Sequence, residues 1–160
     1  MTAAPRRDAE QEQRAFVEDV AIVFEAFRLP RMAGRIVGRL LLAVPAEQSS
    51  DQLAEYLNAS KGSISTMTRQ LIDGGLVERV GKPGERRDYF RIRPGSWEKL
   101  IVASLRGYQE MHLLAERGLR LQVAKDDDVR DRLDGMHLVY EVLAEQVPAM
   151  LEELTRRLAR

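Results

Sequence analysis

The chain has 160 residues, of which 44% are hydrophobic and 31% are charged, and its formal net charge is zero. This composition is typical of a globular protein and excludes an intrinsically disordered one. The lack of cysteine excludes disulfides, thiol catalysis and cysteine-ligated zinc sites. Since no apolar run approaches the ~20 residues that span a bilayer, and the amino terminus lacks the apolar segment of a secretory signal, we expect a cytoplasmic protein without a membrane partner.

Two helices are expected before residue 44. From residue 10 to residue 28 apolar residues recur at steps of three and four, which predicts a helix. That helix ends or kinks at Leu29-Pro30, because the residue before a proline is pushed out of the α region. A second helix is expected from Arg31 to Ala43, where Gly34 and Gly38 either allow a close helix approach or are simply tolerated on a packed face. The apolar residues are Phe16, Val20, Val23, Phe24 and Phe27 in the first helix and Met32, Ile36, Val37, Leu40 and Leu41 in the second.

The next two predicted helices form a helix-turn-helix. Ser49 can cap the first, and Gln52 lies where a capping box needs its second member. Ser60 can cap the second, which ends at Gly74-Gly75, a pair suited to a left-handed helix stop. Two short helices joined by a tight turn, with the small Ala54 at their crossing, are typical of a helix-turn-helix.

A β-hairpin is expected directly after the helix-turn-helix. Residues 76–80 and 88–93 are strand-like runs, and Gly81-Lys82-Pro83-Gly84 between them is typical of a turn. From residue 60 to residue 93 the chain has eight basic and four acidic residues, so the excess of positive charge is local. A helix-turn-helix followed by a basic hairpin is a winged helix-turn-helix.

The chain from Ser96 onward is expected to be helical. A new helix should start at residues 126–128, because aspartates are favourable at the positive end of the helix dipole. Pro148 cannot donate a backbone hydrogen bond to Ala144, so a kink or break is expected there. The helix from residues 126–128 onward carries a heptad-like apolar seam, which needs a partner helix in this chain or in another. The helix from Ser96 has the apolar stripe Trp97, Leu100, Ile101, Leu105, Tyr108, Met111, Ala115 and Leu119. The seam of the later helix is Val129, Leu133, Met136, Tyr140, Leu143, Val147, Met150 and Leu154.

The expected fold is mainly α with a small β-hairpin wing (α+β), a winged helix-turn-helix flanked by N- and C-terminal dimerisation helices. Residues 1–29 form an N-terminal helix contributing to the dimer, 30–95 the DNA-binding domain, and 96–160 a helical dimerisation region. A homodimer is expected because one winged domain makes few phosphate contacts, whereas two recognition helices reach half-sites about one turn apart.

The outer face of residues 60–71 is expected to enter the major groove of double-stranded DNA. Small side chains let the backbone approach, hydroxyls can donate to phosphates or bases, and a helix N-terminus attracts phosphate. Arg69 is the long donor for a guanine or a phosphate. A plain solvated face, or a winged helix that binds only proteins, stays an open alternative. The predicted DNA-binding residues are Ser60, Lys61, Gly62, Ser63, Ser65, Thr66 and Arg69 on the helix and Lys82, Arg86 and Arg87 on the hairpin.

The run from Gly34 to Ile92, with LAEYLNASKGSISTMTRQLIDGGLVERV and PGERRDYFRI, resembles the MarR family of bacterial transcription regulators, and most of all its GbsR-like branch. The resemblance implies a homodimer that binds a pseudo-palindrome as a repressor or activator. Where the wider family has basic residues in the recognition helix and an Asp-Arg-Arg wing, this chain has Thr66 and Glu85-Arg86-Arg87. The wing role therefore transfers to Arg86 and Arg87, and base-by-base specificity does not transfer.

Other chemistry has little support in the sequence. His112 and His137 each lie on a helix with no cysteine and no nearby histidine partner, so we expect no metal ligand and no cofactor. Asp126–Asp128 are interpreted as a cap and first turn of a helix. No catalytic motif is present, which argues against an enzyme. A small-molecule effector is a further possibility, because an aromatic box suits a quaternary ammonium ion such as a choline-type compound; ordinary core packing is the alternative. The candidate effector-binding residues are Phe24, Phe27, Trp97, Tyr108 and Tyr140.

Overall fold

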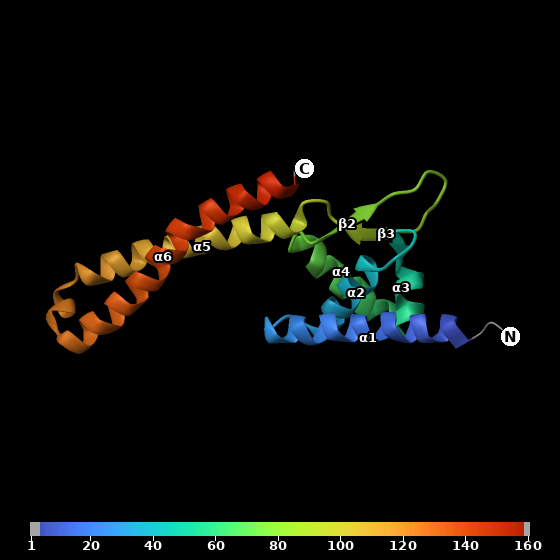
Figure 1. Cartoon of the computed structure of the whole chain (residues 1–160), viewed down its shortest axis with the longest axis horizontal. Helices are drawn as coiled ribbons and strands as arrows, with labels where there is room; N and C mark the ends of the chain where they lie inside the picture. Colours follow the sequence, from blue (N-terminus) through green and yellow to red (C-terminus); the bar gives the residue numbers. More distant parts are fainter. Residues whose placement is uncertain (1–3, 159–160) are drawn as a thin grey trace. The chain divides into compact units, whose positions relative to one another are not determined.

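The computed structural model describes residues 4–158, which form two compact units that divide after Ser96 (Figure 1). The fold is mainly helical with one small sheet, as predicted. None of the described helices is long and apolar enough to cross a membrane. The first unit holds α1 (Ala4–Ala26), α2 (Arg31–Leu41), β1 (Gln48–Ser49), α3 (Ser50–Leu57), α4 (Lys61–Asp73), β2 (Val77–Val80) and β3 (Tyr89–Ile92), and the second holds α5 (Ser96–Leu119), the 3₁₀ turn η1 (Gln122–Lys125) and α6 (Asp127–Leu158).

Helices α1 and α2 pack at unusually close range. A Cβ added at Gly34 would lie 2.6 Å from the Cα of Ala21, and one added at Gly38 would lie 3.0 Å from the Cα of Val17. Only glycine fits such an approach, because a side chain would displace the α1 backbone. Of the two interpretations of this glycine pair, close approach is therefore the right one.

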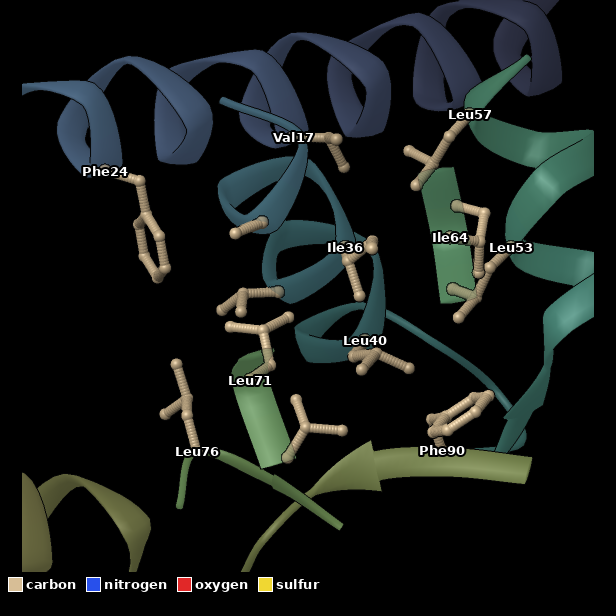
Figure 2. Close-up of a cluster of buried hydrophobic side chains, with 13 residues drawn as sticks. Val17, Phe24, Ile36, Leu40, Leu53, Leu57, Ile64, Leu71, Leu76 and Phe90 are labelled. Atoms are coloured by element: carbon tan, nitrogen blue, oxygen red, sulfur yellow. The ribbon is translucent and has the colours of Figure 1, made fainter. Parts of the chain in front are cut away.

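One apolar core joins the elements of the first unit, and Figure 2 shows its side chains pointing toward one another from α1, α2, α3, α4 and the sheet. Burial at this density is what holds the second helix of the helix-turn-helix in a fixed orientation. The core residues are Val17, Phe24, Ala33, Ile36, Val37, Leu40, Leu53, Leu57, Ile64, Leu71, Leu76, Val77 and Phe90.

The ends of α3 and α4 are closed as predicted. At the start of α3 the Ser49 hydroxyl accepts from the Gln52 N–H at 3.2 Å, and the Ser49 N–H donates to the Gln52 side chain at 2.8 Å, a complete capping box. Helix α4 ends in a Schellman arrangement, with Gly75 at φ +76° and the Leu76 N–H donating to the Leu71 carbonyl at 3.0 Å. These closures fix the length of both helices.

The sheet has three antiparallel strands in the order β1-β3-β2. The predicted hairpin is present, with Val77 opposite Ile92 and Val80 opposite Tyr89. Strand β1, which was not predicted, pairs Gln48 with Phe90 and so joins the start of α3 to the hairpin. Its two residues carry no periodic signal, because their pairing depends on a strand far along the chain.

In the second unit α5 and α6 lie side by side and antiparallel (Figure 1). Two contacts show the antiparallel direction. Tyr108 of α5 contacts Tyr140 of α6, and farther along α5 a Cβ on Gly118 would lie 2.8 Å from a methyl of Leu133, which comes earlier in α6. The α6 seam is its inner side, with Val147 buried and only Met150 of the eight exposed. Of the kink or break expected at Pro148, the break does not occur, since α6 continues to Leu158.

Several residues of the predicted apolar repeats are exposed in the single chain. In α1 the buried face is Val17, Ala21 and Phe24, whereas Phe27 is 73% exposed and Phe16 and Val23 are also exposed. The helical period was predicted correctly, but the close contact with the glycines of α2 selects the neighbouring face. Leu41, Trp97 and Leu100 are exposed in the same way.

Candidate nucleic-acid interface

Helix α4 has one buried face and one polar face. Ile64, Thr68 and Leu71 are buried, while Thr66 and Arg69 are exposed on the opposite side. Thr68 belongs to the inner face because its hydroxyl donates to the carbonyl of Ile64 at 2.8 Å, which satisfies the hydroxyl inside the core. The serine and threonine side chains that remain on the outer face are short, so the helix backbone can approach a ligand closely.

The first turn of α4 is built to receive an anion. The Ser60 hydroxyl accepts from the Ser63 N–H at 3.1 Å and keeps its own proton free to donate. Lys61 and Gly62 are exposed beside it, and Ser63 is half-buried. The unpaired N–H groups of a helix start and the positive dipole end favour a phosphate at this position.

Lys61 also forms an ion pair with Asp51 of α3, at 2.7 Å. The hydrogen bond from Lys61 lowers the pKa of Asp51, and the positive charge of Lys61 adds to this effect. Both side chains are largely exposed, so the pair contributes little to stability. Lys61 can therefore leave Asp51 and bind a phosphate with little loss of folding stability.

The charges of the hairpin fall into two groups. Arg91 donates to Glu78 at 2.7 Å and lies 3.6 Å from Glu47, while Arg79 lies 3.5 Å from Asp88. These arginines are neutralised within the strands. Arg86 and Arg87, at the exposed end of the hairpin, form no ion pair with a carboxylate in the part of the chain that the structure describes. The local excess of positive charge is thus concentrated on these two side chains, on Lys82 and on Arg69.

Lys82 has a different environment. Its Nζ lies 4.2 Å from the centroid of the Tyr89 ring, a cation–π contact, and the side chain is half-buried. The Tyr89 hydroxyl donates to the carboxylate of Glu85, and this hydrogen bond raises the pKa of Tyr89. Lys82 and Tyr89 therefore hold the two sides of the hairpin together, and Lys82 is less free than Arg86 to move onto a ligand.

Comparisons with known proteins agree with this geometry. A model of the MarR family matches residues 41–89, and one described as MmpR5-like MarR family transcriptional regulator matches residues 95–157. The chain is 44% identical over 112 residues to the HTH-type transcriptional regulator MmpR5 of Mycobacterium tuberculosis, covering 70% of this chain and 68% of that protein. This chain belongs to the MarR family. It is accordingly a DNA-binding transcriptional regulator.

Two further similarities bear on the architecture of this MarR-family chain. A crystal structure described as a transcriptional regulator superposes with a TM-score of 0.73 at 36% identity, over 91% of this chain and 99% of that one. The putative HTH-type transcriptional regulator YvaV of Bacillus subtilis is 26% identical over 102 residues, 64% of this chain and 57% of that protein. The structural similarity extends across both units, so the winged helix-turn-helix and the α5–α6 hairpin are both MarR-type elements.

The predicted effector residues of this MarR-family chain are divided between the two units. Phe24 is buried in the core of the first unit and Phe27 is exposed there. In the second unit Trp97 is exposed, and the rings of Tyr108 and Tyr140 meet with their centroids 6.3 Å apart. The box of five aromatic residues stays a prediction, and the tyrosine pair is the part of it that the second unit assembles.

The environment of the two histidines was predicted wrongly from the sequence. His112 of α5 and His137 of α6 were expected to have no histidine partner, and that expectation is wrong: their ring centroids lie 4.6 Å apart. The two positions are far apart in sequence, and the antiparallel packing of α5 on α6 brings them together. The interpretation of Asp126 as a helix cap is confirmed, since its carboxylate accepts from the Val129 N–H at 3.1 Å.

Proposed function

We propose that the protein binds a pseudo-palindromic operator as a homodimer, with α4 of each copy in the major groove and each hairpin against the DNA backbone. The observation that carries the proposal is the two-faced α4. Its inner side is locked into the core through Ile64 and Leu71, and its outer side offers short hydroxyl side chains and the long donor Arg69. A helix held this firmly presents its polar face in a fixed orientation, as groove reading requires.

Each predicted DNA-binding residue has a role in this proposal. Arg69 reaches base edges or clamps a phosphate, and Ser65 and Thr66 lie against the groove. Ser60, Lys61, Gly62 and Ser63 form the helix start that meets a phosphate. Arg86 and Arg87 bind backbone phosphates, and Lys82 mainly supports the hairpin through Tyr89.

The homodimer is proposed from the apolar surface of the second unit. Two helices can bury only one seam between them, and Leu138, Val139 and Val142 of α6 remain about half exposed or more, as does Leu113 of α5. Beside the tyrosine pair, α5 and α6 leave an open apolar cavity of about 650 Å³. A second copy is the natural cover for these apolar side chains, because a monomer seldom leaves so many of them exposed on two neighbouring helices. The cavity is lined by Ile101, Ser104, Tyr108, Leu143, Gln146, Val147, Ala149 and Met150.

Small-molecule control is a further part of the proposal. Tyr108 lines the open cavity and its ring contacts that of Tyr140, so the cavity offers one aromatic wall of the kind that suits a quaternary ammonium ion. A placement in the GbsR-like branch would favour choline-type ligands, whereas the model that matches residues 95–157 is described as MmpR5-like. A thermal-shift panel of choline, betaine and aromatic acids is the direct test, and no shift at millimolar ligand would remove the effector from the proposal.

The DNA-binding proposal is tested by the salt dependence of binding. Each neutralised phosphate contributes about 0.9 to the slope of log K against log salt concentration. The double variant Arg86→Ala with Arg87→Ala should weaken binding to specific and random duplexes alike, and should reduce the slope by about 1 for each phosphate that is no longer neutralised. Fluorescence anisotropy at four or more salt concentrations gives both quantities.

The chain offers a matched control. Arg156 and Arg157 are also adjacent and exposed, but both are paired with Glu153 on α6 of the second unit, which has no part in the proposed DNA surface. The double variant Arg156→Ala with Arg157→Ala changes the net charge equally and should leave the slope unchanged. Equal slopes in both double variants would contradict the wing assignment, and a wild-type protein that ignores every duplex would favour a winged helix that binds proteins.

A further inference from the structure

The only two histidines of the chain share one site with a glutamate. His112 and Glu116 are four residues apart on α5, so they lie on the same helix face. His137 reaches this face from α6. One ligand atom from each of the three side chains lies within 4.8 Å of the other two. All three residues are half-buried, so the site is sheltered but open to an ion from solvent.

This donor set is characteristic of a transition metal. Imidazole nitrogen suits zinc, copper, nickel and iron, whereas magnesium and calcium prefer sites made only of oxygen. Zinc bonds to His nitrogen and carboxylate oxygen are about 2.0–2.2 Å long, which places the ligands of a tetrahedral site about 3.3–3.5 Å apart. The observed atoms therefore have to approach by about 1.5 Å at most, a movement within reach of side-chain rotation in Glu116 and the two rings.

The surroundings of the three side chains fit a bound metal ion better than a contact between side chains alone. The Nδ1 atom of His112 is buried and has no hydrogen-bond partner in the described part of the chain. The other ring nitrogen, Nε2, lies 3.8 Å from a carboxylate oxygen of Glu116, so Nε2 is the atom that faces the site, and an ordered water would satisfy Nδ1. Glu141 has a carboxylate oxygen 3.8 Å from Nδ1 of His137, where an outer carboxylate orients a metal-binding imidazole.

We propose that His112, Glu116 and His137 bind one divalent transition-metal ion, with zinc the best match, and that the ion joins α5 to α6. Three protein ligands leave a fourth position for water. The site lies entirely in the second unit, whereas the α4 face and the wing belong to the first, so its metal is not needed for the DNA contacts proposed above. Because only the folded helical hairpin brings α6 to α5, binding should stabilise the native state by mass action.

The test is metal titration of the full-length chain after removal of metals with a chelator. We expect one Zn²⁺ per chain by isothermal titration, a rise in melting temperature with added Zn²⁺, and no effect of Mg²⁺. Co²⁺ as a probe should give the visible absorption of a four-coordinate ion with nitrogen and oxygen ligands. His112→Gln and His137→Gln should each weaken Zn²⁺ binding by about 100-fold or more, judged against the 10–100-fold typical of outer-shell changes.

A matched control is Glu110→Gln, which removes an exposed carboxylate from α5 close to His112 and should leave the affinity unchanged. The proposal is overturned if wild-type protein takes up no stoichiometric Zn²⁺ at micromolar concentration. This result needs no variant to fold and would leave the histidines as a pair of tilted rings in contact. The proposal is equally overturned if a folded His137→Gln variant binds Zn²⁺ as tightly as wild type.

Discussion

The two units of this protein differ in how many hydrophobic side chains they bury. In the first unit, side chains from four helices and the sheet meet in one core of thirteen buried residues. In the second unit, α5, η1 and α6 bury only Ala115, Ala124 and Val147 among their described hydrophobic residues. The first unit therefore has what a self-sufficient domain needs, whereas the second is a helical hairpin with apolar surface left over. The difference suggests a division of labour, in which the first unit fixes a DNA-reading helix and the second joins two copies.

The largest effect should come from opening the core of the first unit. Leu53 is fully buried on α3 beneath the recognition helix. Leu53→Ala should cost about 2–5 kcal/mol of unfolding free energy, because it removes buried methyl groups and leaves a cavity. Denaturant unfolding followed by circular dichroism measures this, and a decrease below about 1 kcal/mol would mean that the first unit is not packed as described.

The second effect should concern association rather than folding. Leu138 is 61% exposed in one copy, so Leu138→Glu should fold normally but place a charge in the proposed dimer interface. Burying an unpaired charge there should weaken the dimer by about 2 kcal/mol or more. Sedimentation at micromolar concentration should show the variant dissociating where wild type does not. Gln70→Glu, an added charge on the first unit, should sediment as wild type, and equal behaviour of the two variants would contradict a role of α6 in pairing.

Features that depend on residues close together in the sequence were predicted better than features that depend on distant ones. The capping box of Ser49 and Gln52, the cap at Ser60 and the stop at Gly75 were all predictable, because each depends on near neighbours in the chain. Strand β1, the exposed position of Phe16 and the His112–His137 pair were not, because each depends on an element far away in sequence. Thr68 is buried although it lies among the polar residues of its helix, since only the three-dimensional structure shows which threonine bonds back to the helix.

A smaller effect separates the two helix caps. Ser49→Ala and Ser60→Ala each remove a hydroxyl that accepts from a helix N–H and should each cost about 1 kcal/mol of stability. Ser49 is buried at the sheet, whereas Ser60 lies on the proposed DNA face. Only Ser60→Ala should therefore weaken operator binding under conditions where both variants are folded. Equal decreases in affinity would mean that the α4 N-terminus does not touch the DNA directly.

The smallest effect concerns the ion pairs that join α1 to α2. Hydrogen bonds from Arg35 and then Arg31 outweigh burial and lower the pKa of Glu18. A lowered pKa adds stability that is present above the unfolded value of about 4.5 and is lost as the pH falls through the folded value. Because the carboxylate is about one-third exposed, Glu18→Gln should cost less than about 1 kcal/mol at pH 7. The unfolding free energies of the two proteins should converge as the pH falls from 4.5 through the lowered pKa of Glu18, and a difference that stays constant over that acidification would contradict a stabilising role of these ion pairs.

The most direct measurement is the stoichiometry of the protein on DNA. Duplexes from the upstream region of its own gene that carry an inverted repeat are the substrates; sedimentation gives the mass of the complex and footprinting gives the protected bases. We predict two chains on each duplex, with two protected half-sites centred about one helical turn apart. One chain for each duplex, or protection of a single half-site at saturation, would contradict the pairing of two recognition helices through the second unit.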